Sequence, residues 1–335
     1  MGTRIVIDTL GGDNGAPVCV EGAVDGLKKY PDVSLILTGK KKELAKLLSK
    51  YEYDKKRLTV IDCAEEITCH DAPVEAVKKK KDSSLVVGLN QIKEGKADAL
   101  ISAGSSGAVL AGGMLLVGRV KGIERPPFAP LIPTEKGVAI LLDCGANVDA
   151  RPSHLVQFAI LGSLYMEHVV GIKNPTVALL NIGAEEDKGN ALCKETFPLL
   201  KECKDINFIG NIEARDVTAG AADVIVSEGF AGNIALKMLE GTGKTLLSVV
   251  KSAMMSTTRS KIGALLVKPA LKDAFKKFDA TSYGGAPLLG CKGLVVKTHG
   301  NAKMGEIYNT IMQCRTFKKE NINDKIKLRF SPTED

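Results

Sequence analysis

The feature that most constrains the fold of this chain is the alternation of short apolar runs with longer segments of helical length. In residues 154–170, for example, apolar side chains recur at the spacing of a helix face. Strands that are apolar throughout and alternate with helices are typical of a parallel sheet covered on both faces. We therefore predict an α/β fold, a three-layer α/β/α sandwich with a mainly parallel sheet, with strands at residues 4–8, 34–38, 58–61, 97–102, 138–143, 176–181, 207–210, 223–227 and 294–297.

Six of these runs end in the same way, at a polar residue accompanied by a glycine-bearing loop. Ligands of open α/β sheets bind beyond the carboxyl ends of the strands. Glycine lets main-chain N–H groups approach a ligand, and the helix that follows points its positive end at an anion. Some of these loops will be only tight turns. Together they predict a polar cleft for phosphate on one edge of the sheet, where the strand-end residues are Asp8, Ser102, Asp143, Asn181, Asn211 and Ser227.

Composition narrows the choice of partners. The 335-residue chain has 46 basic and 39 acidic residues, a net charge of +7. This balance favours an anionic partner such as phosphate, an acidic protein or a membrane surface, or it merely keeps the protein soluble. There is no tryptophan and only 4% of residues are aromatic, which argues against stacking on nucleic-acid bases. We expect no nucleic acid among the partners.

Cysteine usage and the first residues indicate the compartment. The eight cysteines include no CxxC pair and no Cys/His cluster of the kind that holds zinc. Reduced thiols in the cytosol explain them most simply, so we expect a cytoplasmic protein. The chain starts directly with a strand, and we expect no signal peptide.

One stretch has the length of a membrane span. Residues 99–118 carry no charge over 20 residues, but they include five glycines and three serines. We interpret this stretch as a buried strand, a turn and a buried helix.

The chain shows no Pro/Ser-rich linker, so we expect one domain over residues 1–320 and a polar C-terminal tail at 321–335. A basic, apolar stretch at 259–277 stands apart from the rest. We expect Pro269 to interrupt it and to give two short helices or a basic helical hairpin at about 255–280. Such a segment suits an anionic membrane surface or a partner subunit, and the sequence leaves both open.

Eight motifs, in order over about residues 4–310, resemble signatures of the bacterial phosphate acyltransferase family of the PlsX type. They are DTLGGDN at 8–14 with Pro17, KKKDSS at 79–84, SAGSSGA at 102–108, DCGANVD at 143–149, NIGAEE at 181–186 with KGN at 188–190, NIEARD at 211–216, GFAGN at 229–233 and YGGAPLLG at 283–290.

The resemblance implies an enzyme that moves a long acyl chain from acyl carrier protein to inorganic phosphate, making acyl phosphate for phospholipid synthesis. It implies a homodimer without an organic cofactor, with a fold similar to phosphotransacetylases and to isocitrate and isopropylmalate dehydrogenases. It also implies a cytoplasmic enzyme in loose peripheral contact with the membrane or with the downstream glycerol-3-phosphate acyltransferase.

Phosphate already carries a nucleophilic oxygen, and a thiol with a pKa of about 8.5 leaves readily. The reaction therefore needs positioning and oxyanion stabilisation more than a Ser-His-Asp triad. We expect His154, which opens a helix beside the third loop, to protonate the leaving sulfur, with His299 a weaker candidate. Lys188 and Arg215 would offset the phosphate charge. The full catalytic set is His154, Lys188 and Asn233, and the substrate-binding set is Asp8, Gly12, Asp13, Asn14, Gly104, Ser105, Ser106, Gly107, Asn147, Asn181, Asn211, Arg215 and Gly232.

Within these sets, the glycine loops at 104–107 and 232–233 would supply main-chain donors. Asn147, Asn181 and Asn211 would orient the substrate. We expect no metal site.

Three rival functions remain open from the residues alone. The first is a phosphotransacetylase that uses a coenzyme A thioester, since the chemistry is the same. The second is an NAD-dependent decarboxylating dehydrogenase, which needs a carboxylate cluster for its metal, and Asp13, Asp143 and Asp149 form no obvious one. The third is a non-catalytic membrane scaffold.

Overall fold

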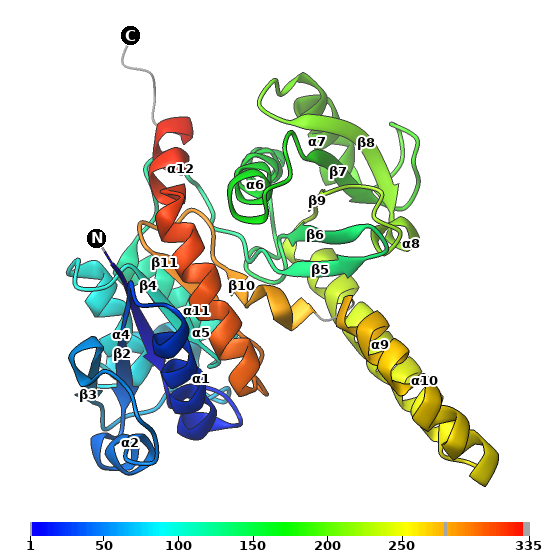
Figure 1. Ribbon diagram of the computed structural model, residues 1–335. Coiled ribbons are helices and arrows are strands. Elements are labelled where there is room, and N and C mark those ends of the chain that lie inside the picture. Colours follow the sequence, from blue (N-terminus) through cyan, green and yellow to red (C-terminus); the bar gives the residue numbers. More distant parts are fainter. Residues whose placement is uncertain (1, 278–279, 331–335) are drawn as a thin grey trace.

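The computed structural model describes residues 2–277 and 280–330, apart from the side chains of 272, 273, 275–277, 280 and 281. The strands form two sheets in place of the single sheet that we expected. A long helical hairpin projects from the body that contains both sheets (Figure 1). Residues 278–279 of the expected hairpin and 331–335 of the expected tail lie outside the described residues.

The six-stranded sheet has the order β10-β11-β4-β1-β2-β3, and only β10 runs antiparallel to its neighbour. In β1, Ile5 and Ile7 join one hydrophobic cluster and Val6 joins another, so both faces of the sheet are buried. Helices α1 (Gly15–Lys29) and α11 (Met304–Lys319) cover the first face, and α4 (Ser84–Lys93) and α5 (Ser106–Gly112) cover the second. The strands are β1 (Thr3–Asp8), β2 (Val33–Gly39), β3 (Leu58–Asp62), β4 (Ala99–Ser102), β10 (Ala286–Pro287) and β11 (Leu294–Lys297).

The five-stranded sheet has the order β5-β6-β9-β7-β8, and it is parallel except for β5. Helix α6 (Pro152–Tyr165) packs on one face, and α8 (Ala214–Val217) with the start of α9 (Gly229–Met254) packs on the other. Helices therefore cover both faces here as well, which confirms the α/β class and the layered arrangement. The strands are β5 (Leu131–Thr134), β6 (Gly137–Leu142), β7 (Thr176–Asn181), β8 (Asn207–Glu213) and β9 (Val224–Val226).

Shorter elements complete the body. They are α2 (Lys41–Leu48), α3 (Pro73–Lys79), α7 (Ala191–Glu202), the 3₁₀ turns η1 (Lys55–Arg57) and η4 (Ala280–Tyr283), and the π-helical turns η2 (Gly113–Val117) and η3 (Met166–Val170). With β4, α5 and η2 in place, residues 99–118 form the buried strand, turn and helix that we predicted.

All nine predicted strands are present, but β5 and β10 were not predicted. Both are short and contain a proline, Pro133 or Pro287, which weakens any strand signal in the sequence. Strand β8 runs on past the predicted end at Gly210, because a bulge at residues 209–210 lets its pairing with β7 continue to Glu213.

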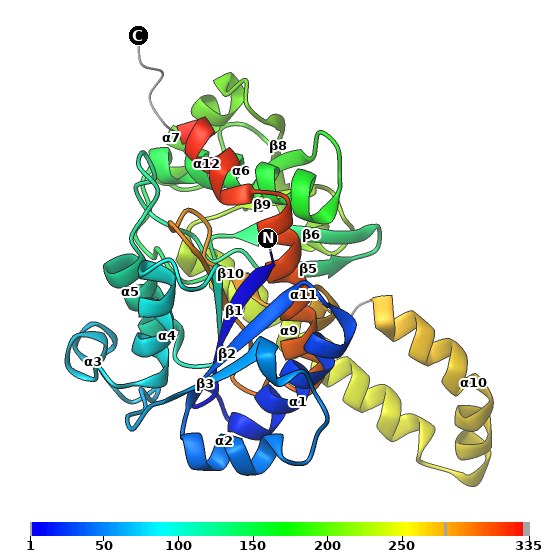
Figure 2. The same cartoon turned by 60° about the vertical axis from the view of Figure 1, so that its left-hand side comes forward.

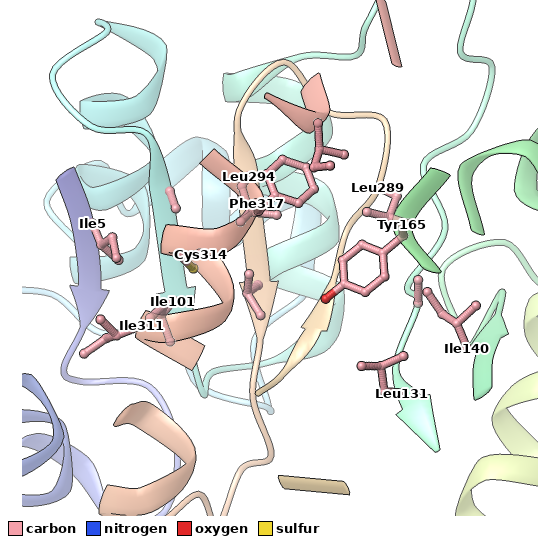
Figure 3. Close-up of a cluster of buried hydrophobic side chains, with 14 of the residues drawn as sticks. Ile5, Ile101, Leu131, Ile140, Tyr165, Leu289, Leu294, Ile311, Cys314 and Phe317 are labelled. Carbon is pink, nitrogen blue, oxygen red and sulfur yellow. The ribbon is translucent and has the colours of Figure 1, made fainter. Parts of the chain in front are cut away.

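Two features join the sheets. Residues 127–129 exchange main-chain hydrogen bonds with Pro287 and Leu289 beside the six-stranded sheet, and Phe128 also accepts from Cys144 after β6. One hydrophobic cluster then runs through both sheets, as Figure 3 shows around Tyr165. The hydroxyl of this fully buried tyrosine accepts a hydrogen bond of 2.8 Å from Gln313 on α11.

The hairpin consists of α9 and α10 (Thr258–Lys277), and it extends well beyond the body in both views (Figures 1 and 2). It is longer than the predicted segment at 255–280, because α9 supplies one arm. The expectation that Pro269 breaks the second arm was wrong, since α10 continues through it. A proline removes one hydrogen bond of the helix, and the packing of α10 along α9 holds the arm together.

The expected polar tail contains a helix, α12 (Ile322–Phe330). Its Ile322 and Ile326 are buried in the large cluster, so two apolar residues fix a segment that is otherwise polar. No helix in the described part of the chain combines the length and apolar character that a membrane span requires.

Candidate active site

The predicted strand-end loops do not share one edge. Those after β1 and β4 belong to the six-stranded sheet, and those after β6, β7, β8 and β9 belong to the five-stranded sheet. Sequence reasoning placed them together because it assumed one sheet. The two groups meet through α9, whose Glu240 lies 3.1 Å from Nε2 of His299, beyond the end of β11.

Asp8 organises the first group of loops. Its buried carboxylate accepts hydrogen bonds from Ser84 Oγ at 2.5 Å and Ser102 Oγ at 2.7 Å, and from the amides of Leu10 and Gly11 at 3.3 and 3.2 Å. These contacts tie β1, β4 and α4 to the loop after β1. The carboxylate therefore holds this loop in shape, and its contacts offer no reason for it to touch substrate.

The turn of Gly12, Asp13 and Asn14 rests on residues 300–302. The amide of Asp13 donates to Gly300 O at 2.7 Å, and the side chain of Asn14 donates to Asn301 O and Ala302 O. Gly12 has φ +86°, and a Cβ there would lie 2.7 Å from Gly300 O. The turn thus needs glycine for both its conformation and its close packing.

The loop at residues 103–107, called the Gly104 loop below, has free donors. The amide of Gly104 donates to Ser102 Oγ at 3.1 Å. Within the described residues, the amides of Ser105, Ser106 and Gly107 have no hydrogen-bond partner, since Ser105 makes no side-chain cap at the start of α5. Such donors at a loop-to-helix junction suit an oxyanion.

His299 forms an ionic cluster beside these loops. Its Nδ1 lies 2.9 Å from Glu306 Oε1 and its Nε2 lies 3.1 Å from Glu240 Oε1. Hydrogen bonds to Glu240 and then Glu306 raise the pKa of His299 to about 10. The ring is therefore a cation at neutral pH that links α9 to the six-stranded sheet.

Asp143 organises the loops of the five-stranded sheet, as Asp8 organises those of the six-stranded sheet. Its buried carboxylate accepts from the amides of Phe128 at 2.8 Å, Ala146 at 3.3 Å and Asn147 at 2.5 Å, and from Asn147 Nδ2 at 2.9 Å. Burial raises the pKa of Asp143 to about 6, although these hydrogen bonds pull it down. Asn147 also donates to Pro126 O, so the structure commits its amide to the loop.

Gly232 and Asn233 lie inside α9, and they do not form the open loop that we expected. The amide of Gly232 donates to Glu228 O, while Glu228 caps the helix through its carboxylate, which accepts from Phe230 and Ala231. A Cβ at Gly232 would lie 2.0 Å from Asp143 O, so glycine is needed for packing. The prediction that main-chain amides at 232–233 would face substrate was wrong. The Asn233 side chain does lie against Gly145.

The loop after β7 gathers three of the predicted residues. Asn181 Nδ2 donates to Lys188 O at 3.1 Å, and Asn211 Nδ2 donates to Glu185 O at 2.8 Å. Asn211 Oδ1 is buried and has no partner within the described residues. Lys188 is exposed. Arg215, 77% exposed, pairs with Glu213 at 2.9 Å.

His154 is almost fully buried at the start of α6. Its Nδ1 accepts the main-chain N–H of Arg151 at 3.1 Å, and its Nε2 lies 3.1 Å from Glu124. Burial lowers the pKa of His154, and Glu124 opposes that effect. These contacts fit a helix cap, and its predicted role as an acid stays a prediction.

The structure thus brings together Asp8, Gly12, Asp13, Asn14 and the Gly104 loop as one group, and Asn147, Gly232 and Asn233 as another. Lys188, Asn181 and Asn211 form a third, with Arg215 and His154 apart. Sequence reasoning missed the helix cap Glu228 and the last residue of β11, Lys297. The strand at 294–297 ends in a polar residue with Gly300 close behind, which is the pattern used for the other six loops.

No group of three or more residues that could hold a metal ion occurs in the described part of the chain. A cavity of about 240 Å³ lies at the opposite, amino end of the six-stranded sheet, beside Arg4, Asp98 and Lys292.

The amino-acid sequence was compared with protein families and with curated proteins. The family described as "Fatty acid synthesis protein" matches residues 3–325. The phosphate acyltransferase of Alkaliphilus oremlandii is 50% identical over 323 residues, 96% of each chain. That of Clostridium botulinum is 48% identical over 328 residues, 98% of each chain.

Among solved structures, a phosphotransacetylase from Streptococcus pyogenes aligns with a TM-score of 0.64 at 18% identity, over 95% of this chain and 94% of that one. A 4-hydroxythreonine-4-phosphate dehydrogenase from Salmonella typhimurium aligns with a TM-score of 0.52 at 12% identity, over 94% of this chain and 99% of that one. These likenesses concern the fold alone, and they agree with the fold expected. Because the family match and the identity to its curated members both extend over nearly the whole chain, this protein belongs to the fatty acid synthesis protein family, whose members include the phosphate acyltransferases.

Proposed function

We propose that this protein is an acyltransferase that moves a long-chain acyl group from acyl carrier protein to inorganic phosphate. The observation that carries the proposal is the near-full-length similarity to proteins named phosphate acyltransferase. The free amides of the Gly104 loop support it, because they suit a phosphate oxygen or the oxyanion of a thioester under attack.

The chemistry is a direct transfer. A phosphate oxygen attacks the thioester carbon, a C–O bond forms, the C–S bond breaks, and the thiolate takes a proton from solvent or an acid. In this proposal the Gly104 loop binds the anion, and Asp8 and Asp143 keep the loops of the two sheets in shape. Lys188, Arg215, Asn181 and Asn211 contact the substrate from the five-stranded sheet, with Asn233 beside them. His154 protonates the sulfur only if the start of α6 opens.

The hairpin is the part of the molecule best suited to partners. Its described side chains are mostly exposed and combine basic and apolar groups, including Lys237, Lys244, Lys251, Arg259, Lys261 and Lys268 with Met238, Leu246, Val249, Ile262, Leu265 and Leu266. Acyl carrier protein is acidic, so charge favours it here. Apolar residues on both arms favour a second copy of the chain along the hairpin and a membrane surface at its tip.

On this proposal the enzyme works in the cytoplasm as a homodimer, in loose contact with the membrane or the downstream glycerol-3-phosphate acyltransferase. Charge reversal of Lys261 and Lys268 to glutamate should weaken binding to carrier protein or to vesicles of anionic lipid. Unchanged binding to both would remove the hairpin from this role.

The reaction is tested by release of free carrier thiol from palmitoyl-acyl carrier protein, with and without inorganic phosphate. We expect release that requires phosphate and a product that reacts with hydroxylamine. Turnover only with acetyl- or acyl-coenzyme A would instead indicate a phosphotransacetylase activity. No turnover with either donor would contradict the proposal.

A further inference from the structure

Lys297 ends β11, next to the Gly104 loop. The register of the sheet pairs it with Ser102, the last residue of β4. Its side chain is half-buried, and Nζ donates to Ala103 O at 3.3 Å and to Thr298 O. The ammonium group therefore lies directly beside the residue that precedes Gly104.

Within the described residues, Lys297 has acidic neighbours but no carboxylate as a direct partner. Burial lowers the pKa of Lys297, and the nearby Glu306, Asp13 and Asp8 oppose that effect. Asp8 is occupied by two serine hydroxyls and two amides, and Glu306 by His299. Within the described residues, no carboxylate comes within 4.0 Å of Lys297 Nζ. A half-buried cation that contacts only two carbonyl groups has donor capacity left for an anion.

The other candidate cations are placed differently. Lys188 is exposed, and Arg215 is exposed and already paired with Glu213. Lys188 follows β7 and Arg215 follows the edge strand β8, both in the five-stranded sheet. Lys297 instead lies among the loops that Asp8 organises. Partial burial strengthens the interaction of Lys297 with an anion, because less water screens it.

We propose that Lys297 is the cation that binds the phosphate substrate, with its free N–H directed at an oxygen held by the Gly104 loop. This inference rests on the proposed function and adds the residue that supplies its positive charge. In this role Lys297 lowers the repulsion between the phosphate dianion and the oxyanion by its charge and transfers no proton.

The kinetic test compares Lys297→Met with Lys292→Met, which removes an exposed lysine near the amino end of the same strand. We expect Lys297→Met to raise the phosphate KM by about tenfold or more, and to leave the KM for the acyl donor within about twofold. Lys297→Arg should fall between this variant and the wild type. Lys292→Met should match the wild type. A phosphate KM within about twofold of wild type in folded Lys297→Met overturns the inference.

A second test needs neither a variant nor turnover. Acetic anhydride modifies free amines, and mass spectrometry reports the rate at each lysine of the wild-type protein. We expect inorganic phosphate to slow modification of Lys297 by about fivefold or more, with Lys292 unchanged as the internal control. Equal protection of both residues, or of neither, contradicts the inference. Protection without phosphate-dependent thiol release would instead keep Lys297 as an anion site and reject the proposed reaction.

Discussion

The two sheets repeat one local design with different results. In each, a buried aspartate at a strand end, Asp8 or Asp143, gathers the amides of a glycine loop. Beside Asp8, the Gly104 loop keeps three amides that have no partner within the described residues. Beside Asp143, the start of α9 is closed, because Glu228 caps it and Asn147 accepts from Gly229. A strand, an aspartate and a glycine loop therefore leave donors free for an anion only where nothing else in the chain fills them.

The largest expected effect separates the two aspartates. Both carboxylate oxygens of Asp143 accept hydrogen bonds from N–H groups. In Asp143→Asn the side-chain NH2 group must therefore face an N–H donor and cannot accept from it. Within the described residues, Asp8 Oδ2 accepts only from Ser102 Oγ, a hydroxyl that can rotate to accept. We expect Asp143→Asn to lower the free energy of unfolding by about 2–3 kcal/mol and Asp8→Asn by about 1 kcal/mol, measured by urea denaturation at pH 7. Equal losses would contradict this difference between the two carboxylates.

The next effect concerns the closed helix start. Glu228→Ala removes the cap of α9, which should cost about 1 kcal/mol of unfolding free energy. The phosphate KM should stay within about twofold of wild type, since this helix start does not bind the anion. Glu228→Gln, which keeps an acceptor oxygen, is the matched control. A large rise in the phosphate KM for Glu228→Ala would place the anion at α9.

A smaller effect tests the link between the sheets. The folded protein raises the pKa of His299 to about 10, so the link stabilises the fold fully below pH 6.5 and is lost as pH rises through 10. The ring is 43% exposed, and solvent screening limits the contribution to below about 1 kcal/mol. Thermal melts of wild type and His299→Gln should therefore differ most near pH 6.5 and converge toward pH 10. A difference that grows with pH would contradict the assignment.

The smallest stability effect is expected at the exposed cations. Arg215→Ala and Lys188→Ala should each change unfolding free energy by less than about 0.5 kcal/mol. If they contact substrate, the phosphate KM should still rise by about two- to fourfold in each. Phosphate KM and kcat values equal to wild type in both variants would remove these residues from the site and leave Lys297 as the cation.

Local patterns in the sequence specify most of the strands and helices of this protein. The nine predicted strands, the buried interpretation of residues 99–118 and the helix that starts near His154 all follow from patterns within about 20 residues. The motifs also indicated the family, because they lie in the same order over most of the chain.

Which strands share a sheet, and hence which loops meet, depends on contacts made in the folded chain. Pairing joins residues far apart in the chain, such as Ser102 and Lys297, and no local pattern specifies the partner. For the same reason the sequence did not reveal that α9 closes the Asp143 side, that Ile322 and Ile326 anchor a polar segment, or that Lys297 lies beside the open amides. Whether a donor or a charge is free depends on every group packed around it, and that is a property of the folded chain.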